Sequence, residues 1–379
     1  MKTLFFFIVL TLFGTELSRA NDSLYFVASY GAGEQGAITT LTLDEASGRL
    51  RPKHTFSDIQ YAYYLAISPD GKTLYATHGK PTGEAQGGKG ARREFVSAFR
   101  VDATGKLSLL GSRPAHGKSA CFVDTNGRVL VLANYQDGTV VSYPLLPDGS
   151  IGPRSSLIEQ QGSSVDAARQ EGPHAHAALF GPSRDRVFVP DLGADRIFSY
   201  RADSETGSLA PTAQKSVAAV AGAGPRHVRF HPGAAWMYGI NELSGSITRY
   251  DFDADSGALS RRETVSTLPA DFEGKNWCAD LAITPDGQFL YGTNRGHDSV
   301  AAYRIGEGGV LEPIAITPSG GKSPQNLEIT ADGRWLLVAN MSGGNVAVFR
   351  IDWATGTLRE AASRYKIAHP ACIVAATSR

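Results

Sequence analysis

Residues 65–79 read LAISPDGKTLYATHG, and residues 281–296 read LAITPDGQFLYGTNRG. In both stretches an alternating apolar run leads into Pro-Asp-Gly, and a second apolar run follows. Pro-Asp-Gly between two such runs is typical of a tight turn that joins antiparallel strands. The sequence therefore predicts the same β-hairpin at two distant places in the chain.

Variants of this hairpin recur at residues 121–135, 177–192, 228–243 and 327–343. A second element, an alternating strand followed by a turn and Gly-x-Leu or a close relative, occurs seven times and ends at Leu50, Leu107, Ile151, Leu209, Leu259, Leu311 and Leu358. These positions are 44 to 58 residues apart, which is the period of a propeller blade. We predict an all-β, seven-bladed β-propeller with four antiparallel strands per blade, A (inner) to D (outer).

The two ends of the chain complete the repeat. Residues 23–29 look like a B strand without an A strand, and residues 370–377 look like an A strand without a B strand. We expect the two ends to share one blade, which closes the ring and removes exposed sheet edges. Residues 21–379 then form a single domain. Two stacked β-sandwiches, the alternative, do not explain seven phased repeats.

The first twenty residues are typical of a secretory signal. Lys2 precedes an apolar run over residues 3–14, and Ser18-Arg19-Ala20 has small residues where a signal peptidase cuts. The apolar run is short for a membrane anchor. We expect residues 1–20 to be removed and the protein to be periplasmic or secreted, with no membrane attachment afterwards.

Charge and cysteine content narrow the possible partners. The 37 basic and 37 acidic residues balance, so no electrostatic feature favours nucleic acid. Three cysteines without C-x-x-C spacing indicate buried, inert thiols, although one pair could form a disulfide and nothing selects it. We expect a monomer with no nucleic-acid partner.

Strand direction predicts which residues meet. The starts of A strands, the ends of B strands, the B–C loops and the D–A connections should all lie on one face. Long insertions at residues 80–93 and 155–172 should build the mouth of the channel on that face.

Equivalent positions at the B-strand ends differ in how they repeat. One position holds Asn134, Asp191, Asn241, Asn294 and Asn340 in five blades. A turn cap explains this pattern, and a ring of calcium ligands is the alternative. The next position does not repeat: it holds Tyr135, Leu192, Glu242, Arg295 and Met341. The opposite charges of Glu242 and Arg295 indicate a functional site, with an exposed surface ion pair as the alternative.

The A-strand starts vary in the same way. The residue after the opening proline is His174, Arg226, Gln325 or Ala371, and Tyr63 and Ala279 fill this position where the proline is missing. His174 and Arg226 should face the mouth. His176 and His227 beside them, together with Asp191 and Gln325, are candidate substrate-binding residues. His174 and His176 should share one face of a strand and could hold zinc, but no further ligand follows at a suitable spacing, so we expect no metal.

The stretches RQEGPHAH, VPDLGADRI, GAGPRHVRFHP, NEL, TNRGHDS and LLVAN resemble the lactonase family of seven-bladed propellers. This family contains bacterial 6-phosphogluconolactonases and fungal carboxy-cis,cis-muconate cyclases, and the likeness covers residues 23–376. The resemblance implies a site of one histidine, two arginines and one glutamate. By motif these are His174, Arg226, Arg295 and Glu242.

The resemblance also implies a function in carbohydrate metabolism: hydrolysis of a sugar-derived lactone such as 6-phosphogluconolactone, without a cofactor. Arg226 or Arg295 would stabilise the oxyanion, and Glu242 or His174 would deprotonate the attacking water. Two features depart from a cytoplasmic, phosphate-specific relative: the signal sequence, and Gln325 where relatives often have arginine. The alternatives are a muconate-cyclase-type ring closure and a non-catalytic exported propeller that binds a ligand.

Overall fold

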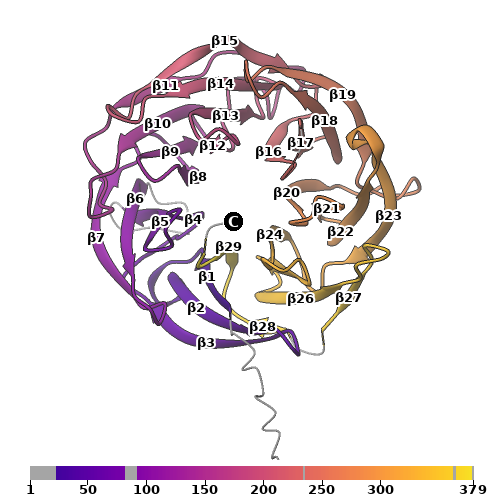
Figure 1. Ribbon diagram of the computed structural model, residues 1–379, viewed down its shortest axis with the longest axis horizontal. Coiled ribbons are helices and arrows are strands. Elements are labelled where there is room, and N and C mark those ends of the chain that lie inside the picture. The colour runs from indigo at the N-terminus through magenta and orange to yellow at the C-terminus, as the bar shows by residue number, and fades with distance from the viewer. Residues whose placement is uncertain (1–22, 82–91, 234, 362–363, 378–379) are drawn as a thin grey trace, which may run out of the picture.

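The computed structural model describes residues 23–81, 92–233, 235–361 and 364–377. Seven antiparallel sheets stand around a common axis, as Figure 1 shows. Within the described ranges the helical elements are two short 3-10 turns, η1 (Gly33–Gln35) and η3 (Glu307–Gly309). The predicted all-β, seven-bladed propeller is confirmed.

The strands of each blade follow one another from the channel outward. From its inner to its outer strand, blade 1 contains β29 (Pro370–Ala375), β1 (Ser23–Ser29), β2 (Ala37–Asp44) and β3 (Arg49–Phe56). Blade 2 contains β4 (Leu65–Ile67), β5 (Thr73–Pro81), β6 (Arg92–Val101) and β7 (Leu107–Pro114). Blade 3 contains β8 (Ala120–Thr125), β9 (Val129–Asn134), β10 (Thr139–Pro144) and β11 (Ser156–Glu159). Blade 4 contains β12 (Leu179–Phe180), β13 (Arg186–Asp191), β14 (Arg196–Ala202) and β15 (Leu209–Ala218).

The remaining blades follow the same order. Blade 5 contains β16 (Pro225–Phe230), β17 (Trp236–Asn241), β18 (Ser246–Phe252) and β19 (Leu259–Ser266). Blade 6 contains β20 (Trp277–Ile283), β21 (Phe289–Arg295), β22 (Ser299–Ile305) and β23 (Leu311–Pro318). Blade 7 contains β24 (Pro324–Ile329), β25 (Trp335–Asn340), β26 (Asn345–Ile351) and an outer strand in two pieces, β27 (Leu358–Glu360) and β28 (Tyr365–Lys366).

The chain ends close the ring as predicted. Strand β29 pairs antiparallel with β1, so that Ile373 lies opposite Val27 and Cys372 opposite Ala28. The inner strand of blade 1 therefore comes from the C-terminus and its other three strands from the N-terminus. This pairing satisfies backbone groups that an open ring would expose.

The predicted Pro-Asp-Gly turns form. In the turn after β4, the N–H of Gly71 donates to the carbonyl of Ser68 at 2.8 Å, and Gly71 has a φ of +70°. A side chain is disfavoured at that φ, which explains the glycine.

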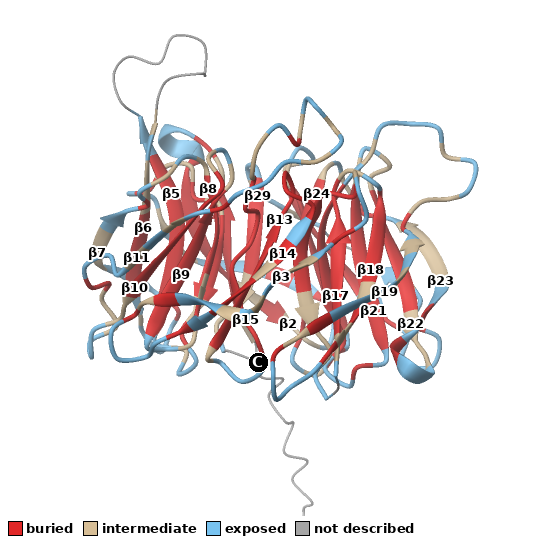
Figure 2. Cartoon of the chain, turned by 90° about the horizontal axis from the view of Figure 1, so that it is seen from above, coloured by how far each residue is buried: buried red, intermediate tan, exposed pale blue. Residues whose placement is uncertain are grey.

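The hydrophobic core lies between neighbouring blades. Figure 2 shows buried strands in the body of the ring and exposed loops at both ends. Large aromatic side chains, among them Phe26, Phe99 and Phe188, are fully buried there, and removing them from water stabilises the blade contacts. The three cysteines are also buried and unpaired, as expected.

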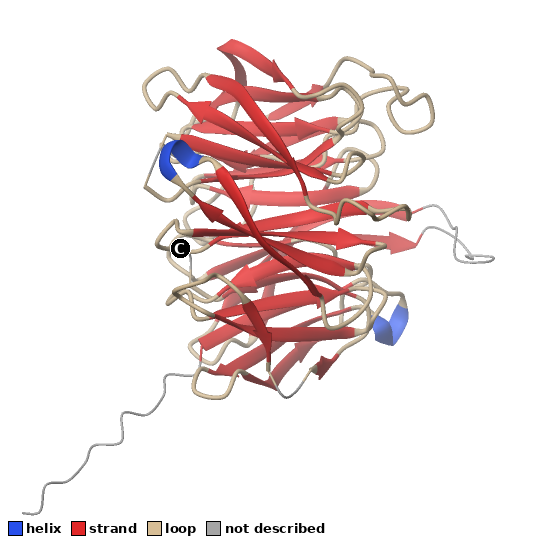
Figure 3. Ribbon diagram, turned by 90° about the vertical axis from the view of Figure 1, so that its right-hand side faces the viewer, coloured by secondary structure: helices blue, strands red, loops and turns tan. Residues whose placement is uncertain are grey.

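Figure 3 shows loops gathered at the two ends of the ring, where strand directions reverse. The predicted insertion at residues 155–172 begins with strand β11, so the connecting loop is shorter than expected. In the other insertion, β5 extends to Pro81 and β6 begins at Arg92, while residues 82–91 lie outside the described residues. The predicted signal at residues 1–20 also lies outside them. None of the described helices has the length and apolar character to cross a membrane.

Candidate active site at one mouth of the propeller

A β-bulge aims a side chain out of the ladder at the start of several inner strands. In blade 5, Pro225 pairs with Asn241 and His227 with Ile240, so Arg226 between them has no partner in the ladder. Gln325 of blade 7 lies in the same kind of bulge. Bulges free a residue from strand alternation and let its side chain turn elsewhere. In blades 5 and 7 the variable position at the A-strand start is thus a bulge position, whereas His174 of blade 4 lies opposite Leu192 outside such a bulge.

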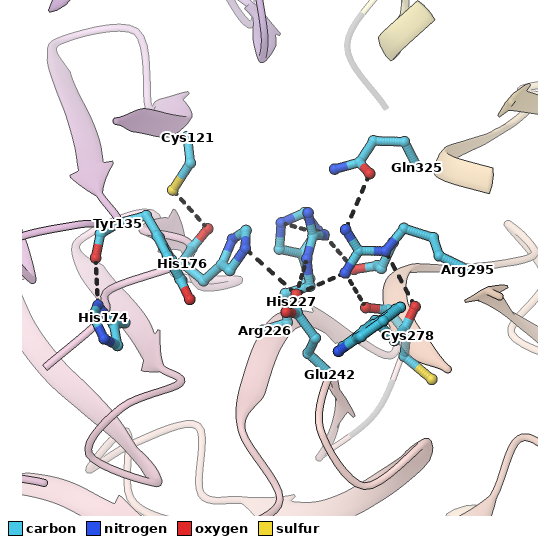
Figure 4. A network of polar contacts seen from close by, with 12 residues as sticks. Cys121, Tyr135, His174, His176, Arg226, His227, Glu242, Cys278, Arg295 and Gln325 are labelled. Carbon is cyan, nitrogen blue, oxygen red and sulfur yellow. Dashed lines mark hydrogen bonds and ion pairs between the residues drawn. The ribbon is translucent and has the colours of Figure 1, made fainter. Parts of the chain in front are cut away.

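Glu242 is the centre of the charged residues at this mouth. It follows β17, and its N–H donates to Gly224 O at 2.7 Å. Its Oε2 accepts from Arg226 Nε at 3.1 Å and from Arg295 Nη2 at 2.7 Å, while its Oε1 accepts from Arg169 Nη2 at 2.6 Å. Glu242 is only 5% exposed. One buried carboxylate therefore holds three guanidinium groups from three parts of the chain, which we call the arginine cluster. Figure 4 shows Glu242 with Arg226 and Arg295.

The arginine cluster keeps Glu242 ionised. Burial raises the pKa of its carboxyl, but Arg295, Arg226 and Arg169 outweigh burial and lower the pKa to about 2. Because both of its oxygens are occupied by guanidinium groups, this carboxylate is poorly placed to accept a proton.

Arg169 comes from the loop that connects β11 to blade 4. Asp166 Oδ1 accepts from the N–H groups of Ala168 and Arg169, and Gln170, which is fully buried, donates to Leu192 O at 2.8 Å. These bonds fix the loop, so that Arg169 Nη2 also reaches the hydroxyl of Tyr135 at 3.0 Å.

Of the two histidines in the GPHAH stretch, His176 is the one that approaches the cluster. Its Nε2 lies 3.8 Å from Glu242 Oε2, and its Nδ1 is buried without a hydrogen-bond partner in the described part of the chain. Burial, followed by the charge of Arg226, lowers the pKa of His176 well below its usual value, so the ring is neutral near pH 7.

His174 lies elsewhere. Its Nδ1 bonds to the backbone oxygen of Tyr135 at 2.9 Å, and its ring stacks on that of Tyr135 (Figure 4). The expected continuous strand is absent: residues 173–178 form only an isolated bridge at Ala175. Both histidine rings nevertheless pack against Tyr135, whose ring centroid lies 4.8 Å from that of His174 and 5.0 Å from that of His176.

Two other predicted substrate-binding residues, Gln325 and His227, bond to side chains of the site. Gln325 links Arg295 to Tyr63: its Oε1 accepts from Arg295 Nη1 at 3.3 Å, and its Nε2 donates to the Tyr63 hydroxyl at 2.7 Å. His227 Nδ1 lies 2.8 Å from Asp280 Oδ1. Both Gln325 and His227 are buried.

Asp191 and the equivalent asparagines cap turns. Asp191 Oδ1 accepts from the N–H groups of His174 and Ala194, and burial raises the Asp191 pKa to about 6. Asn134 Nδ2 donates to Thr139 Oγ1, and Asn294 Nδ2 to Ser299 Oγ, in the corresponding turns. Asp191 is not among the residues that line the cavity beside Glu242.

This cavity, of about 270 Å³, opens next to the arginine cluster. Its lining includes Glu242, Arg169, Arg295 and His176. The rest of the lining is rich in aromatic rings and includes Tyr30, Tyr61, Tyr63, Tyr135, Arg92, Glu94 and Cys121.

Arg92 also lines the cavity, but it is not one of the arginines that bond to Glu242. Its guanidinium lies 4.4 Å from the ring centroid of Tyr61 and 5.3 Å from that of Tyr30. Its ion pair with Glu94 is long, at 3.8 Å. Sequence reasoning did not single out Arg92, Arg169 or Asp280. Only Arg169 had a visible signal, because it begins the RQEGPHAH stretch.

Comparisons with known proteins place this geometry in context. The profile of one protein family, "Lactonase, 7-bladed beta-propeller", matches residues 24–375. A 6-phosphogluconolactonase of Bacillus subtilis is 29% identical over 352 residues, which is 92% of this chain and 97% of the relative. One of Pectobacterium carotovorum is 31% identical and covers 88% of this chain and 90% of its own. The solved structure of the periplasmic gluconolactonase of Pseudomonas aeruginosa superposes with a TM-score of 0.84 at 28% identity, covering 93% of this chain and 98% of that one.

Proposed function

The chain belongs to the lactonase family of seven-bladed β-propellers, and from this premise we propose that it hydrolyses a sugar-derived lactone in the cavity beside Glu242. The observation that carries the proposal is the arginine cluster itself. A single buried carboxylate orients three guanidinium groups, and two of them, Arg169 and Arg295, line a cavity large enough for one sugar ring. The names of the relatives support a lactone as substrate.

Arg295 is the candidate for oxyanion stabilisation. Water attack on the lactone carbonyl carbon gives a tetrahedral intermediate, and its negative oxygen needs preorganised donors. Arg295 lines the cavity and is held by Glu242, Gln325 and the backbone oxygen of Cys278. Arg226 is 1% exposed and is not among the lining residues, so we assign it to holding Glu242.

His176 is the candidate base. As a neutral imidazole it takes a proton from the attacking water and delivers it to the ring oxygen when the C–O bond breaks, which yields the open hydroxy acid. The carboxylate of Glu242, 3.8 Å away, stabilises the transient imidazolium. This role passes to His176 because Glu242 is occupied by arginines and His174 bonds to the backbone of Tyr135.

The tyrosine-rich wall suits a sugar. Aromatic rings offer apolar faces for the C–H groups of a pyranose, and their hydroxyls can bond to its hydroxyls. Arg92 lies among these rings and would receive the end of the substrate remote from the carbonyl, whether that end carries a phosphate or a hydroxyl. We further propose that residues 1–20 are removed and that residues 21–379 act as a monomeric domain in the periplasm or outside the cell, as with the periplasmic relative.

The test is a hydrolysis assay of the purified mature protein on gluconolactone and 6-phosphogluconolactone. Proton release at constant pH measures both substrates in the same way, with spontaneous opening as the blank. Hydrolysis of either lactone well above the blank supports the proposal, and their ratio gives the preference for phosphate. Rates equal to the blank on both would contradict it.

A further inference from the structure

Asp280 is a fully buried carboxylate on inner strand β20, outside the cavity lining. A buried charge of this kind is costly unless it is paired on all sides. Burial raises the pKa of Asp280, but the charges of Arg229 and His227 outweigh burial and bring the pKa well below its usual range. Asp280 is therefore a fixed negative charge, and its two oxygens face different blades of the propeller.

Oxygen Oδ2 of Asp280 ties neighbouring blades together. It accepts from Asn326 Nδ2 at 2.6 Å and from Leu327 N at 3.3 Å, both on blade 7. Asn326 Oδ1 in turn accepts from the N–H of Ile373 on the closing strand β29 at 2.7 Å. This half of the carboxylate has a structural role.

Oxygen Oδ1 faces the arginine cluster through His227. An ionised carboxylate can only accept, so the bond of 2.8 Å to His227 Nδ1 places the ring proton on that nitrogen. Arg226 Nη1 lies 3.1 Å from His227 Nε2 and 3.5 Å from Nδ1, so Nη1 packs against the face of the imidazole ring. Burial and then Arg226 lower the pKa of His227 to about 3, so the ring stays neutral.

Arg226 completes the connection to the cavity wall. Its Nη1 also donates to the backbone oxygen of Ala279, and its Nε donates to Glu242 Oε2 at 3.1 Å. We infer that Asp280 is a positioning residue: by holding the imidazole ring of His227 it orients Arg226, and through Arg226 it orients Glu242 and the arginines at the cavity wall. Its consequence for turnover rests on the proposed lactone hydrolysis.

The bond from His227 Nδ1 to Asp280 shows why the carboxylate matters. It fixes the plane of the imidazole ring against which the Arg226 guanidinium packs. If the ring turned, Arg226 would move, and Glu242 would lose one of the bonds that set its orientation. A small displacement of the groups at a reacting centre can cost about 100-fold in rate.

The decisive variant exchanges two residues, D280N with N326D. It keeps a carboxylate–amide bond between blades 6 and 7 and an acceptor for Ile373 N, but it moves the negative charge away from His227. Asp124→Asn is the control, because Asp124 Oδ2 makes a comparable tie between blades, to Phe180 N at 2.8 Å, with no link to the arginine cluster. Each protein is measured for melting temperature, kcat and KM on the better lactone, and ¹⁵N spectra of His227 and of the Arg226 Nε–H.

We expect the wild-type His227 to be protonated at Nδ1 and the Arg226 Nε–H to be protected from exchange. The exchanged variant should melt within a few degrees of wild type and keep the proton on His227 Nδ1, because the amide oxygen of residue 280 still accepts from it. Without the negative charge beside His227, it should lose the protection of the Arg226 Nε–H and lose about 10- to 100-fold in kcat with little change in KM. The control should keep its kcat. A wild-type ring protonated at Nε2, or an exchanged variant with an unchanged Arg226 Nε–H signal or unchanged kcat, would overturn the inference. Absence of lactonase activity in the wild type would instead refute the proposed function, and the spectra would still test the orientation of Arg226.

Discussion

Arg295 Nη2 donates to Glu242 Oε2 at 2.7 Å, and the two residues occupy the same position, directly after the B-strand asparagine, in neighbouring blades 5 and 6. The propeller repeat brings equivalent positions of adjacent blades together at one mouth. Opposite charges placed there must therefore meet. The side chain of Arg295 is 20% exposed and that of Glu242 is 7% exposed, so the alternative of an exposed surface ion pair is wrong.

Glu242→Gln should destabilise the fold as well as the site. It removes the one charge that Arg169, Arg226 and Arg295 share, and it leaves buried guanidinium groups uncompensated. We expect the free energy of unfolding to fall by about 3 kcal/mol in urea titrations followed by tryptophan fluorescence. Glu171→Gln is the matched control, since its side chain is 61% exposed, and should change stability by less than about 0.5 kcal/mol. Equal midpoints for the two variants would refute the compensation argument.

Stability should fall as the pH is lowered from about 6.5 towards 3. The folded-state pKa of His227 is lowered from 6.5 to about 3, chiefly by burial and then by Arg226. In that window the unfolded chain binds a proton at His227 that the folded protein does not, so acid favours unfolding. His227→Gln should flatten this part of the stability–pH curve.

His78 is the control for this measurement. Burial, with a contribution from Lys80, lowers its pKa to about 4, and its Nε2 bonds to Ser97 Oγ outside the arginine cluster. His78→Gln should also flatten the curve, but only above about pH 4. A His227→Gln protein that keeps the wild-type slope between pH 4 and 3 would show that His227 is not held neutral.

Arg169→Gln should impair lactone hydrolysis although Arg169 lies on a loop. It removes a cavity cation and one of the three guanidinium partners of Glu242. We expect kcat/KM to fall by about 10-fold or more, a loss typical of a charged hydrogen bond of 1.5–3 kcal/mol. Arg196→Gln is the control: Arg196 is an exposed residue whose Nη1 bonds to Ser216 Oγ, and kcat/KM should not change. Equal values for both variants would exclude Arg169 from the site.

Deletion of residues 370–379 should destabilise the entire ring. It removes β29, which pairs with β1 and contacts Asn326 through Ile373 N. The inner edge of β1 would then lie open, and blades 7 and 1 would lose a shared contact. Calorimetry should give a much lower melting temperature and visible aggregation. A truncated protein that melts like the intact one would contradict closure by the termini.

The fold could be predicted from sequence because the repeat is local and appears seven times. The charged site could be found for the same reason: Glu242 and Arg295 depart from a pattern that the other blades define. Arg226 was found as the variable residue at an A-strand start, although the bulge that turns it was not visible in the sequence.

The rest depended on geometry that periodicity does not encode. Arg169 reaches Glu242 because Asp166 and Gln170 fix a loop conformation, and no repeat predicts that conformation. The approach of His176 to Glu242 could not be predicted, because residues 173–178 are not a continuous strand. Asp280 was overlooked because its partners lie on other blades, at residues 227 and 326.

The central claim is that the cavity beside the arginine cluster hydrolyses a lactone with Arg295 at the oxyanion. The most direct test is kcat of Arg295→Gln on the better lactone substrate, with the melting temperature as the check on folding. Arg295 is partly exposed, and Arg169 and Arg226 still compensate Glu242, so the variant should fold. The account predicts a loss of about 10²–10³ in kcat with a melting temperature near that of wild type. A folded Arg295→Gln protein with the wild-type kcat would contradict it.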